Sequence, residues 1–516
     1  MLTGDPDDNV AQLLWRHARR HPDRPCLTDL DSPEGARTLS YGELTARVAG
    51  LAGGLRDAGI RAGDRVAVLL RNSVEFVETF LAVAAVGAVV VPFNVRLRED
   101  DFRHMLVDSG SRLLVTEAGH LDAAPTLREV PGLRVVLVDT DGGLDPLRAG
   151  PIDEPAEPPE GGLLSLMYTS GTTGAPKAVM LTHRSWRAVA ATAMSVLGFA
   201  SDDVVLHVAP LTHGAGFMLL PTLAAGGHNL LCGSYDAART ARLLHSAKVT
   251  GLFLVPSMIR MFLDELDEDW QIREGFRWLY YAGSPIDQST LREATAAFDG
   301  HVVQSFAQME SPMFLTVLDS ADHLRALRNP DSPVIRSAGR VLPGVELSIV
   351  DPDGTPLPPG SDGEVVARAP QMMAGYWGRA KETAATLADG WLHTGDIGHL
   401  DEDGYLHVVD RLKDMIVTGG SNVYAREVEE VLLTISRIGD AAVIGTPDRI
   451  WGEAVTAVLV PDGRPPADDQ IIEACRRKLP GYRIPKRIIW VAELPRNAYG
   501  KILKRELRER YSTPGR

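Results

Sequence analysis

Short apolar runs alternate with amphipathic stretches along most of the chain. In the first 140 residues, the runs 65–70, 87–91 and 112–116 predict strands, and residues 73–84 predict a helix. The alternation resumes beyond residue 162 with runs that predict strands at 163–167, 204–208, 251–255, 278–282 and 302–306. Strands and helices that alternate at this spacing indicate βαβ units and a parallel sheet. The pattern therefore predicts an α/β fold.

The pattern changes near residue 343 to short strands separated by turns. Asp351-Pro-Asp-Gly354 and Asp401-Glu-Asp-Gly404 both end in Asp-Gly, which is a hairpin signal between apolar alternations. A compact α+β unit follows from residue 414, with helices expected near 427–434 and 468–478. We predict a large N-terminal domain over residues 1–411, with parallel or mixed sheets, flanking helices and a small β subdomain. A small C-terminal domain over residues 412–516 follows, joined to the first near Asp410–Asp414. The Gly, Pro, Asp and Glu content of residues 141–162 predicts a mobile surface segment.

Composition excludes several classes of partner. The chain has 516 residues, of which 45% are hydrophobic and 23% charged, as in globular proteins with several cores. Its formal net charge is −15 and it has no long basic tract, which argues against nucleic acid or an anionic membrane as the main partner. Any anionic ligand must therefore be held by local donors.

Cysteine usage and the apolar runs indicate a cytoplasmic protein. Cys26, Cys232 and Cys475 lie far apart and form no C-x-x-C pair, so neither a disulfide framework nor a zinc site is expected. The longest apolar run, Phe80 to Val91, is too short to span a bilayer and better fits a helix that runs into a buried strand. The acidic N-terminal residues lack a signal-peptide pattern.

The most informative stretch is Tyr168-Thr-Ser-Gly-Thr-Thr-Gly-Ala-Pro-Lys177. Glycines allow backbone N–H groups to face an anion, and the hydroxyls and Lys177 add donors suited to phosphate oxygens. The spacing of a Walker P-loop is absent. A polar turn between strands is the alternative, and the stretch by itself favours nucleotide binding only modestly.

Six stretches, taken together and in order, resemble the adenylate-forming superfamily of acyl-CoA synthetases, stand-alone adenylating enzymes and luciferases. The resemblance covers nearly the whole chain. Chance matches at six ordered places are very improbable. The stretches are 168–177, 209–216, 281–285, 305–310, 391–396 with 410–413, and 495–505.

The resemblance implies where ATP binds. The 168–177 loop would close over the β- and γ-phosphates, the 281–285 turn would lie along the adenine, and Asp396 would accept hydrogen bonds from the ribose hydroxyls. Arg411 would lie near the ribose and phosphate. The implied ATP-binding residues are Thr169, Ser170, Gly171, Thr172, Thr173, Gly174, Lys177, Gly283, Ser284, Pro285, Phe306, Ala307, Gln308, Met309, Asp396 and Arg411.

The stretch Ser305-Phe-Ala-Gln-Met-Glu310 departs from the family pattern, which is roughly Tyr-Gly-x-Thr-Glu. Glu310 matches the carboxylate that helps to hold Mg²⁺, a hard cation that prefers oxygen ligands. Phe306 can stack on adenine but lacks a hydroxyl. Met309 replaces a threonine that commonly touches the α-phosphate, and Ala307 replaces a glycine. These changes put the α-phosphate contacts and the nature of the nucleophile in doubt.

The resemblance also implies the catalytic groups. Lys501 matches the family's catalytic lysine, which bridges the substrate carboxylate and the α-phosphate, and His213 matches a residue that gates the carboxylate pocket. Lys413 falls at the hinge about which the mobile C-terminal domain swings. Lys504 and Arg505 are expected on a solvated face.

A further stretch, 418–427, resembles the segment whose glycines line the tunnel for the pantetheine arm of CoA. Gly419 and Gly420 would let a thin thiol arm pass, and Trp451 could stack on the CoA adenine. A partly buried structural tryptophan is an equally good interpretation of Trp451.

We therefore expect an enzyme that uses ATP, Mg²⁺ and CoA to convert a carboxylic acid to an acyl-adenylate and then a thioester, as a monomer or homodimer. A mostly apolar pocket favours an aryl or medium to long acyl chain; its candidate residues are His213, Phe217, Val255, Met258, Gly283, Ala307, Pro312 and Met313. Three alternatives stay open: transfer to a carrier protein or an amine, activation of nitrite for diazotisation, and a non-catalytic nucleotide-binding protein.

Overall fold

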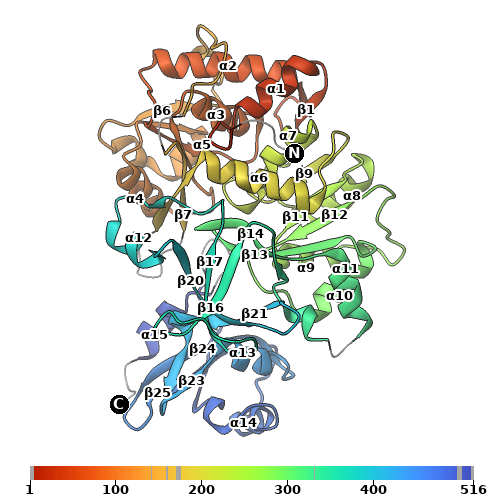
Figure 1. Ribbon diagram of the computed structural model, residues 1–516, viewed down its shortest axis with the longest axis vertical. Coiled ribbons are helices and arrows are strands. Elements are labelled where there is room, and N and C mark those ends of the chain that lie inside the picture. The colour runs from red at the N-terminus through yellow and green to blue at the C-terminus, as the bar shows by residue number, and fades with distance from the viewer. Residues whose placement is uncertain are drawn as a thin grey trace. The chain divides into compact units, whose positions relative to one another are not determined.

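The computed structural model describes residues 5–140, 142–158, 161–169, 176–329, 332–496 and 502–512 (Figure 1). The chain forms two compact units. The first comprises Met1–Leu347 and Ala367–Leu392, and the second comprises Ser348–Val366 and His393–Arg516. The domain boundary predicted between residues 411 and 412 falls inside the second unit and stays a prediction.

A nine-stranded sheet forms one half of the described part of the first unit. Its central strands pair in parallel, as the sequence predicts, and antiparallel strands close both edges. The strands, in spatial order, are β15 (Arg340–Val341), β14 (Ser311–Leu318), β13 (Val302–Gln308), β12 (Trp278–Tyr281), β11 (Gly251–Leu254), β9 (Val204–His207), β10 (His228–Leu231), β1 (Pro25–Asp29) and β2 (Arg37–Ser40).

A seven-stranded sheet forms the other half of that unit's described residues. Five neighbouring strands are parallel, and an antiparallel pair stands at one edge. In spatial order they are β18 (Gly375–Tyr376), β8 (Lys177–Thr182), β7 (Leu163–Thr169), β4 (Val89–Pro92), β3 (Arg65–Leu69), β5 (Leu113–Thr116) and β6 (Arg134–Leu137). The strands predicted at 65–70, 87–91, 112–116 and 163–167 are therefore confirmed.

Helices connect the parallel strands of the first unit. Ser40 caps α2 by accepting a hydrogen bond from the Glu43 amide, and Ser73 caps α3 in the same way. The α3 helix leads into buried β4, which confirms the prediction for the 80–91 run. The helices are α1 (Gln12–Arg20), α2 (Tyr41–Asp57), α3 (Val74–Ala85), α4 (Glu99–Ser109), α5 (Ala118–Ala123), α6 (His183–Leu197), α7 (Leu219–Ala225), α8 (Ala237–Ser246), α9 (Pro256–Leu263), α10 (Gln288–Ala297), α11 (Ser320–Arg328) and α12 (Ala380–Thr386).

Residues 142–158 are held against the first unit, so the prediction of a mobile surface segment is wrong for them. The indole N–H of Trp15 donates to the Asp153 carbonyl at 2.9 Å, and the Ala156 amide donates to the Ala85 carbonyl at 2.7 Å. Within α2, a Cβ on Gly54 would stand 1.3 Å from the Leu147 carbonyl oxygen. The glycine therefore permits the backbone of this segment to rest directly on the helix.

The second unit contains short strands and the C-terminal helices α13 (Ala425–Leu433), α14 (Asp468–Arg476) and α15 (Lys504–Tyr511), of which α13 and α14 were expected. The predicted Asp401–Gly404 turn joins β20 to antiparallel β21. One sheet has β16 (Glu346–Val350), β17 (Gly363–Arg368), β20 (Trp391–Leu400) and β21 (Leu406–Arg411), and β19 (Leu387–Ala388) pairs with the start of β20, at residues that belong to the first unit. The other sheet has β23 (Ser421–Val423), β22 (Ile416–Thr418), β25 (Gly452–Pro461), β24 (Ile438–Asp448) and β26 (Arg487–Trp490). Among the described residues, no helix has the length and apolar character needed to cross a bilayer.

Candidate active site

Four neighbouring parallel strands of the nine-stranded sheet lead into most of the residues predicted to bind the nucleotide and the acid. The strands β9, β11, β12 and β13 lie side by side in this order. The segments that follow them or end them are 209–216, 255–258, 282–285 and 306–310. Carboxyl ends of parallel strands meet at one edge of a sheet, and open α/β sheets bind ligands outside that edge. The fold thus gathers at one edge four segments that are spread over residues 209–310 of the sequence.

The adenine-binding segments present surface at that edge. Gly283, Ser284 and Pro285 are exposed, and Gly283 has a φ of +94°, a conformation that favours glycine. Residues 306–310 are half-buried and follow a register irregularity between Phe306 and Gln308. Such partly covered positions can accept a flat ring. Their contacts with ATP stay a prediction.

The predicted acid pocket is apolar but carries a polar cluster. Met313 is buried with a φ of +72°, rare for a non-glycine residue, and its carbonyl oxygen accepts hydrogen bonds from the Tyr280 and Ser305 hydroxyls. Val255 and Met258 are half-buried, whereas Pro312 is buried. Phe217 is 1% exposed and stacks on Trp186 with ring centroids 4.2 Å apart, which places it in the core.

His213 lies in the segment after β9 and is partly buried. Its Nδ1–H donates to the Thr212 carbonyl at 2.8 Å, and burial lowers its pKa below the ordinary value. The neighbouring glycines have packing reasons: a Cβ on Gly214 would meet the Phe253 ring at 3.0 Å, and one on Gly216 would meet the Leu211 carbonyl at 2.0 Å. The neutral imidazole suits contact with a substrate, but the glycines are no evidence for that role.

The phosphate loop is described only at its two ends. Thr169 closes β7 and pairs across the antiparallel ladder with Lys177, which opens β8. Ser170, Gly171, Thr172, Thr173 and Gly174 lie outside the described residues. The ladder therefore places Lys177 directly opposite Thr169, and the contact of the loop with phosphates stays a prediction.

Glu310 stands in the turn between β13 and β14 and is partly exposed. The Tyr376 hydroxyl donates to Glu310 Oε1 at 2.6 Å, and the Met373 amide donates to the Glu310 carbonyl at 2.8 Å. Nothing in the sequence pattern singled out Tyr376, although the Gly375-Tyr376 pair before a tryptophan marks a constrained backbone. In the described part of the chain, no group of three or more His, Cys, Asp or Glu side chains could hold a metal ion.

Asp396 and Arg411 form an ion pair within the second unit. Arg411 Nε lies 2.6 Å from Asp396 Oδ1, and the two residues are directly opposite on β20 and β21. The Asp396 side chain is 5% exposed, and its amide is anchored by the Thr394 hydroxyl. The structure thus brings together the two residues that the sequence assigns to the ribose.

Lys413, the predicted hinge residue, and the segment around residue 501 also belong to the second unit. Lys413 is exposed in the short turn Leu412–Asp414, and Lys501 lies outside the described residues. Arg496 and Ile502 form an antiparallel bridge, and the Leu503 amide donates to the Pro495 carbonyl at 2.8 Å. These contacts tie together the two ends of the segment that carries Lys501.

The prediction that Lys504 is solvated is wrong. Its side chain is 14% exposed and pairs with Glu429 at 2.8 Å, because α15 packs against β24 near this carboxylate. Arg505 is 53% exposed, in agreement with the prediction.

Of the two glycines of the predicted CoA tunnel, Gly419 adjoins Trp451. Gly419 and Gly420 form the turn between β22 and β23, with φ values of +57° and +80°. A Cβ on Gly419 would lie 2.7 Å from the Trp451 ring, whereas the space beside Gly420 is open. Trp451 is 47% exposed, and Lys486 Nζ lies 3.7 Å from its ring centroid. The Lys486 ammonium group therefore covers one face of a partly exposed ring, and stacking of a nucleotide base on Trp451 stays a prediction.

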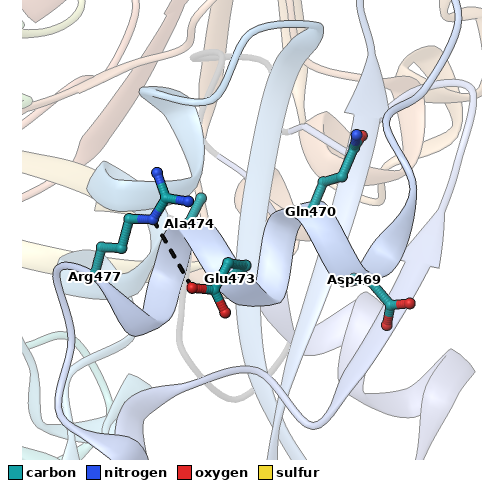
Figure 2. Close-up of a pocket in the computed structure, with 5 residues that line it drawn as sticks. All are labelled: Asp469, Gln470, Glu473, Ala474 and Arg477. Carbon is teal, nitrogen blue, oxygen red and sulfur yellow. Dashed lines mark ion pairs between the residues drawn. The ribbon is translucent and has the colours of Figure 1, made fainter.

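A surface depression on α14 has no part in this arrangement (Figure 2). Arg477 and Glu473 form an ion pair there at 3.9 Å, and Figure 2 shows the remaining side chains projecting separately from the helix. Its lining residues are Asp469, Gln470, Glu473, Ala474 and Arg477.

Comparison with known proteins gives the family and the fold of this chain. Residues 14–377 match the AMP-binding enzyme family, and residues 427–501 match the AMP-binding enzyme C-terminal domain. A feruloyl-CoA synthase from an Amycolatopsis species is 39% identical over 489 residues, covering 92% of this chain and 95% of the relative. ScoC, a fatty acid–[acyl-carrier-protein] ligase of Streptomyces coeruleorubidus, is 34% identical over 513 residues, covering 97% of this chain and 96% of ScoC. The crystal structure of ATP-bound MatB from Rhodopseudomonas palustris has a TM-score of 0.85 and 29% identity, covering 98% of this chain and 99% of MatB.

The fold and the matched families define an adenylate-forming enzyme, which confirms the resemblance found in the sequence. The chain belongs to the AMP-binding enzyme family, among the AMP-forming acid–CoA ligases.

Proposed function

We propose that the protein activates an aryl or medium to long acyl carboxylic acid with ATP and transfers the acyl group to CoA. In the first step a carboxylate oxygen attacks the α-phosphorus of ATP, the bond from that phosphorus to the bridging oxygen breaks, and pyrophosphate leaves. In the second step the CoA thiolate attacks the acyl carbon and AMP leaves. The products are an acyl thioester, AMP and pyrophosphate.

The observation that carries this proposal is the convergence of four segments at the carboxyl ends of β9, β11, β12 and β13. The turn with Gly283 would lie along the adenine, Phe306 would stack on it, and His213 would border the acid. A site that holds both reactants in this order supplies the orientation that a reaction between two anions needs.

Glu310 fits a role as a magnesium ligand. It offers a hard carboxylate oxygen at a partly exposed turn, and Mg²⁺ commonly takes one or two carboxylates and completes its shell with phosphates and water. When bound, the ion would neutralise charge on the phosphates. Lys177 would contact the terminal phosphates and Asp396 the ribose hydroxyls.

The C-terminal domain would serve the two steps in turn. Lys501 would approach the α-phosphate during adenylation, and rotation about Lys413 would then withdraw it and present the CoA tunnel at Gly419 and Gly420. Open space beside Gly420 and the exposed Trp451 ring support passage of the thiol arm and stacking of the CoA adenine.

An aryl acid is the favoured substrate. The predicted pocket is largely apolar, and aromatic rings of Phe253, Tyr280 and Phe314 pack next to it, with Tyr280 and Phe314 stacked at 5.3 Å. The feruloyl-CoA synthase among the relatives acts on an aromatic acid by its name, which supports the same class.

A pyrophosphate-exchange screen over hydroxycinnamic, benzoic and fatty acids tests the proposal, with nitrite as a further arm. We expect ATP–pyrophosphate exchange with aryl acids and, after CoA is added, an acyl-CoA detected by mass spectrometry. A protein that releases no AMP with any acid, nitrite or acceptor would contradict adenylation itself.

A carrier protein is the second candidate acceptor, because ScoC carries that acceptor in its name. The same assay therefore includes a phosphopantetheinylated carrier protein, an amine, and nitrite with an aryl amine. Exchange with an acid followed by loading of the carrier but not of CoA would assign the alternative. If nitrite alone supported ATP–pyrophosphate exchange, the enzyme would activate nitrite in place of a carboxylic acid. Met309, which departs from the family pattern, would then be associated with this change of substrate.

Replacing Gly420 with leucine should block thioester formation and leave pyrophosphate exchange intact. The leucine side chain would fill the open space at the turn, whereas alanine would carry the same strain of positive φ, about 1 kcal/mol, with little bulk. Gly420→Ala is thus the matched control and should retain most of the CoA reaction. Normal thioester formation by Gly420→Leu would remove the tunnel assignment.

A further inference from the structure

One tyrosine in the first unit touches both charged groups that the proposed function places at the ATP phosphates. The Tyr376 hydroxyl donates to Glu310 Oε1 at 2.6 Å, and Lys177 Nζ lies 5.4 Å from the centroid of the Tyr376 ring. The first contact is a hydrogen bond to a carboxylate, and the second is within the range of cation–π attraction.

The backbone around Tyr376 fixes its side chain. Tyr376 pairs with Val179 in the ladder of β18 with β8, the strand that begins at Lys177. Its amide donates to the Thr383 hydroxyl at 2.9 Å, and a Cβ on Gly375 would meet Thr383 Cγ2 at 2.7 Å. Tyr376 itself is 8% exposed. A ring held in this way cannot easily follow either charged partner if one of them moves.

The contact also joins the two sheets of the unit. Tyr376 belongs to the edge strand of the seven-stranded sheet, and Glu310 belongs to the β13–β14 turn of the nine-stranded sheet. The Met373 amide, three residues before Tyr376, holds the main chain of Glu310 at 2.8 Å. The segment 373–376 therefore orients the glutamate through both its backbone and its carboxylate.

Lys177 lies over the Tyr376 ring and Glu310 meets its hydroxyl, so these two opposite charges would attract each other if the side chain were absent. Between these two described residues no ion pair is formed, and each instead contacts Tyr376. A Lys–Glu pair would neutralise the cation needed for the terminal phosphates and occupy the carboxylate needed for a metal ion. The side chain of Tyr376 contacts both charged groups instead, the lysine through its ring and Glu310 Oε1 through its hydroxyl.

We propose that Tyr376 is a positioning residue that keeps Lys177 and Glu310 apart, so that the lysine stays available to the phosphates of ATP and the glutamate to the accompanying magnesium ion. This inference rests on the proposed function. The two parts of the Tyr376 side chain have different roles in this proposal. The ring is a spacer that separates the charges, and the hydroxyl orients the carboxylate.

Two substitutions separate these parts, with ATP binding measured by calorimetry once in EDTA and once with magnesium. Tyr376→Phe keeps the ring and should bind metal-free ATP like the wild type, while magnesium strengthens its binding about tenfold less, because one hydrogen bond to a charged group is lost. Tyr376→Ala removes the spacer and should bind ATP weakly under both conditions.

A third substitution, Glu310→Gln, tests the spacer directly. If Lys177 pairs with Glu310 in Tyr376→Ala, adding Glu310→Gln should restore binding of metal-free ATP severalfold, whereas Glu310→Gln in the wild-type background should change it little. A purely structural role of Tyr376 would give no such rescue. Tyr41→Phe is the matched control, since this fully buried hydroxyl donates to the Gly227 carbonyl at 2.8 Å in another part of the unit.

Melting temperatures of all variants show whether the fold is kept, and Tyr41→Phe gives the shift expected from a lost buried hydroxyl alone. Absence of rescue in the double variant, or equal loss of metal-free and magnesium-ATP binding in Tyr376→Phe, would overturn the positioning role and leave the proposed function standing. A wild-type protein that binds no ATP would overturn the proposed function and this inference with it.

Discussion

Replacing Lys501 with alanine should slow acyl-adenylate formation by about 10²–10³-fold, as expected for one strong electrostatic contact in a transition state. Negative charge grows on the α-phosphate as pyrophosphate leaves, so a fixed ammonium group stabilises the transition state more than the bound reactants. The effect should be confined to the first step. Pyrophosphate exchange measures that step, and single turnover of preformed acyl-adenylate with CoA measures the second, which should stay near the wild-type rate.

The neighbouring cation Arg505 provides a control for this result. It is 53% exposed and pairs with Glu509 on α15, and exposed ion pairs contribute about 0–1 kcal/mol. Arg505→Ala should therefore leave both steps unchanged. Equal losses in the two steps for Lys501→Ala would show a structural defect of the C-terminal domain in place of the assigned role.

Local patterns predicted several strands of the two large sheets because these strands consist largely of apolar residues. The runs near 204, 251, 278 and 302 became β9, β11, β12 and β13. Their order across the sheet could not be derived from periodicity, because pairing between distant strands leaves no local signal. Only the resemblance to a family indicated that the segments after these strands would share one edge.

Glycines were the least reliable guide to function. Those at 214 and 216 follow the predicted site residue His213, yet each has a packing neighbour within 3.0 Å of a hypothetical Cβ, so packing accounts for them. Gly54 in the middle of α2 could have indicated that the 142–158 segment lies on that helix, since glycine in a helix interior costs stability unless close approach requires it. Composition alone indicated a loop.

The charged residues show what a sequence cannot reveal about pairing. Lys504 looked like a solvated residue of a basic stretch, but α15 brings it to Glu429. Tyr376 carries no motif, and its importance follows only from the contacts of its hydroxyl with Glu310 and of its ring with Lys177. Asp396 and Arg411, in contrast, were both singled out, and the β20–β21 hairpin explains why they occur together.

Acidification from pH 7 to pH 5 should lower the free energy of unfolding of the first unit by on the order of 5 kcal/mol through three histidines. His183, His207 and His323 are at most 2% exposed, and burial lowers the pKa of each to about 4. An unfolded histidine has a pKa of about 6.5, so below that pH the unfolded chain binds protons that the folded chain excludes. The contribution of these histidines to the free energy of unfolding is therefore fully present above pH 6.5 and is lost as the pH falls toward 4. At pH 5 the loss is about 2 kcal/mol per histidine.

Urea unfolding across this pH range measures the effect, and His207→Gln isolates one histidine from the buried Asp29 and Glu75, whose raised pKa values act in the opposite direction. His207 Nε2–H donates to Asn229 Oδ1 at 2.7 Å, a bond that a glutamine amide can replace without titrating. Between pH 7 and pH 5, the free energy of unfolding of His207→Gln should fall by about 2 kcal/mol less than that of the wild type. His21→Gln, at an exposed position, should follow the wild-type curve. Identical pH dependence of His207→Gln and the wild type would mean that the His207 imidazole takes up its proton at the same pH in the folded and the unfolded protein, against the burial that the structure gives it.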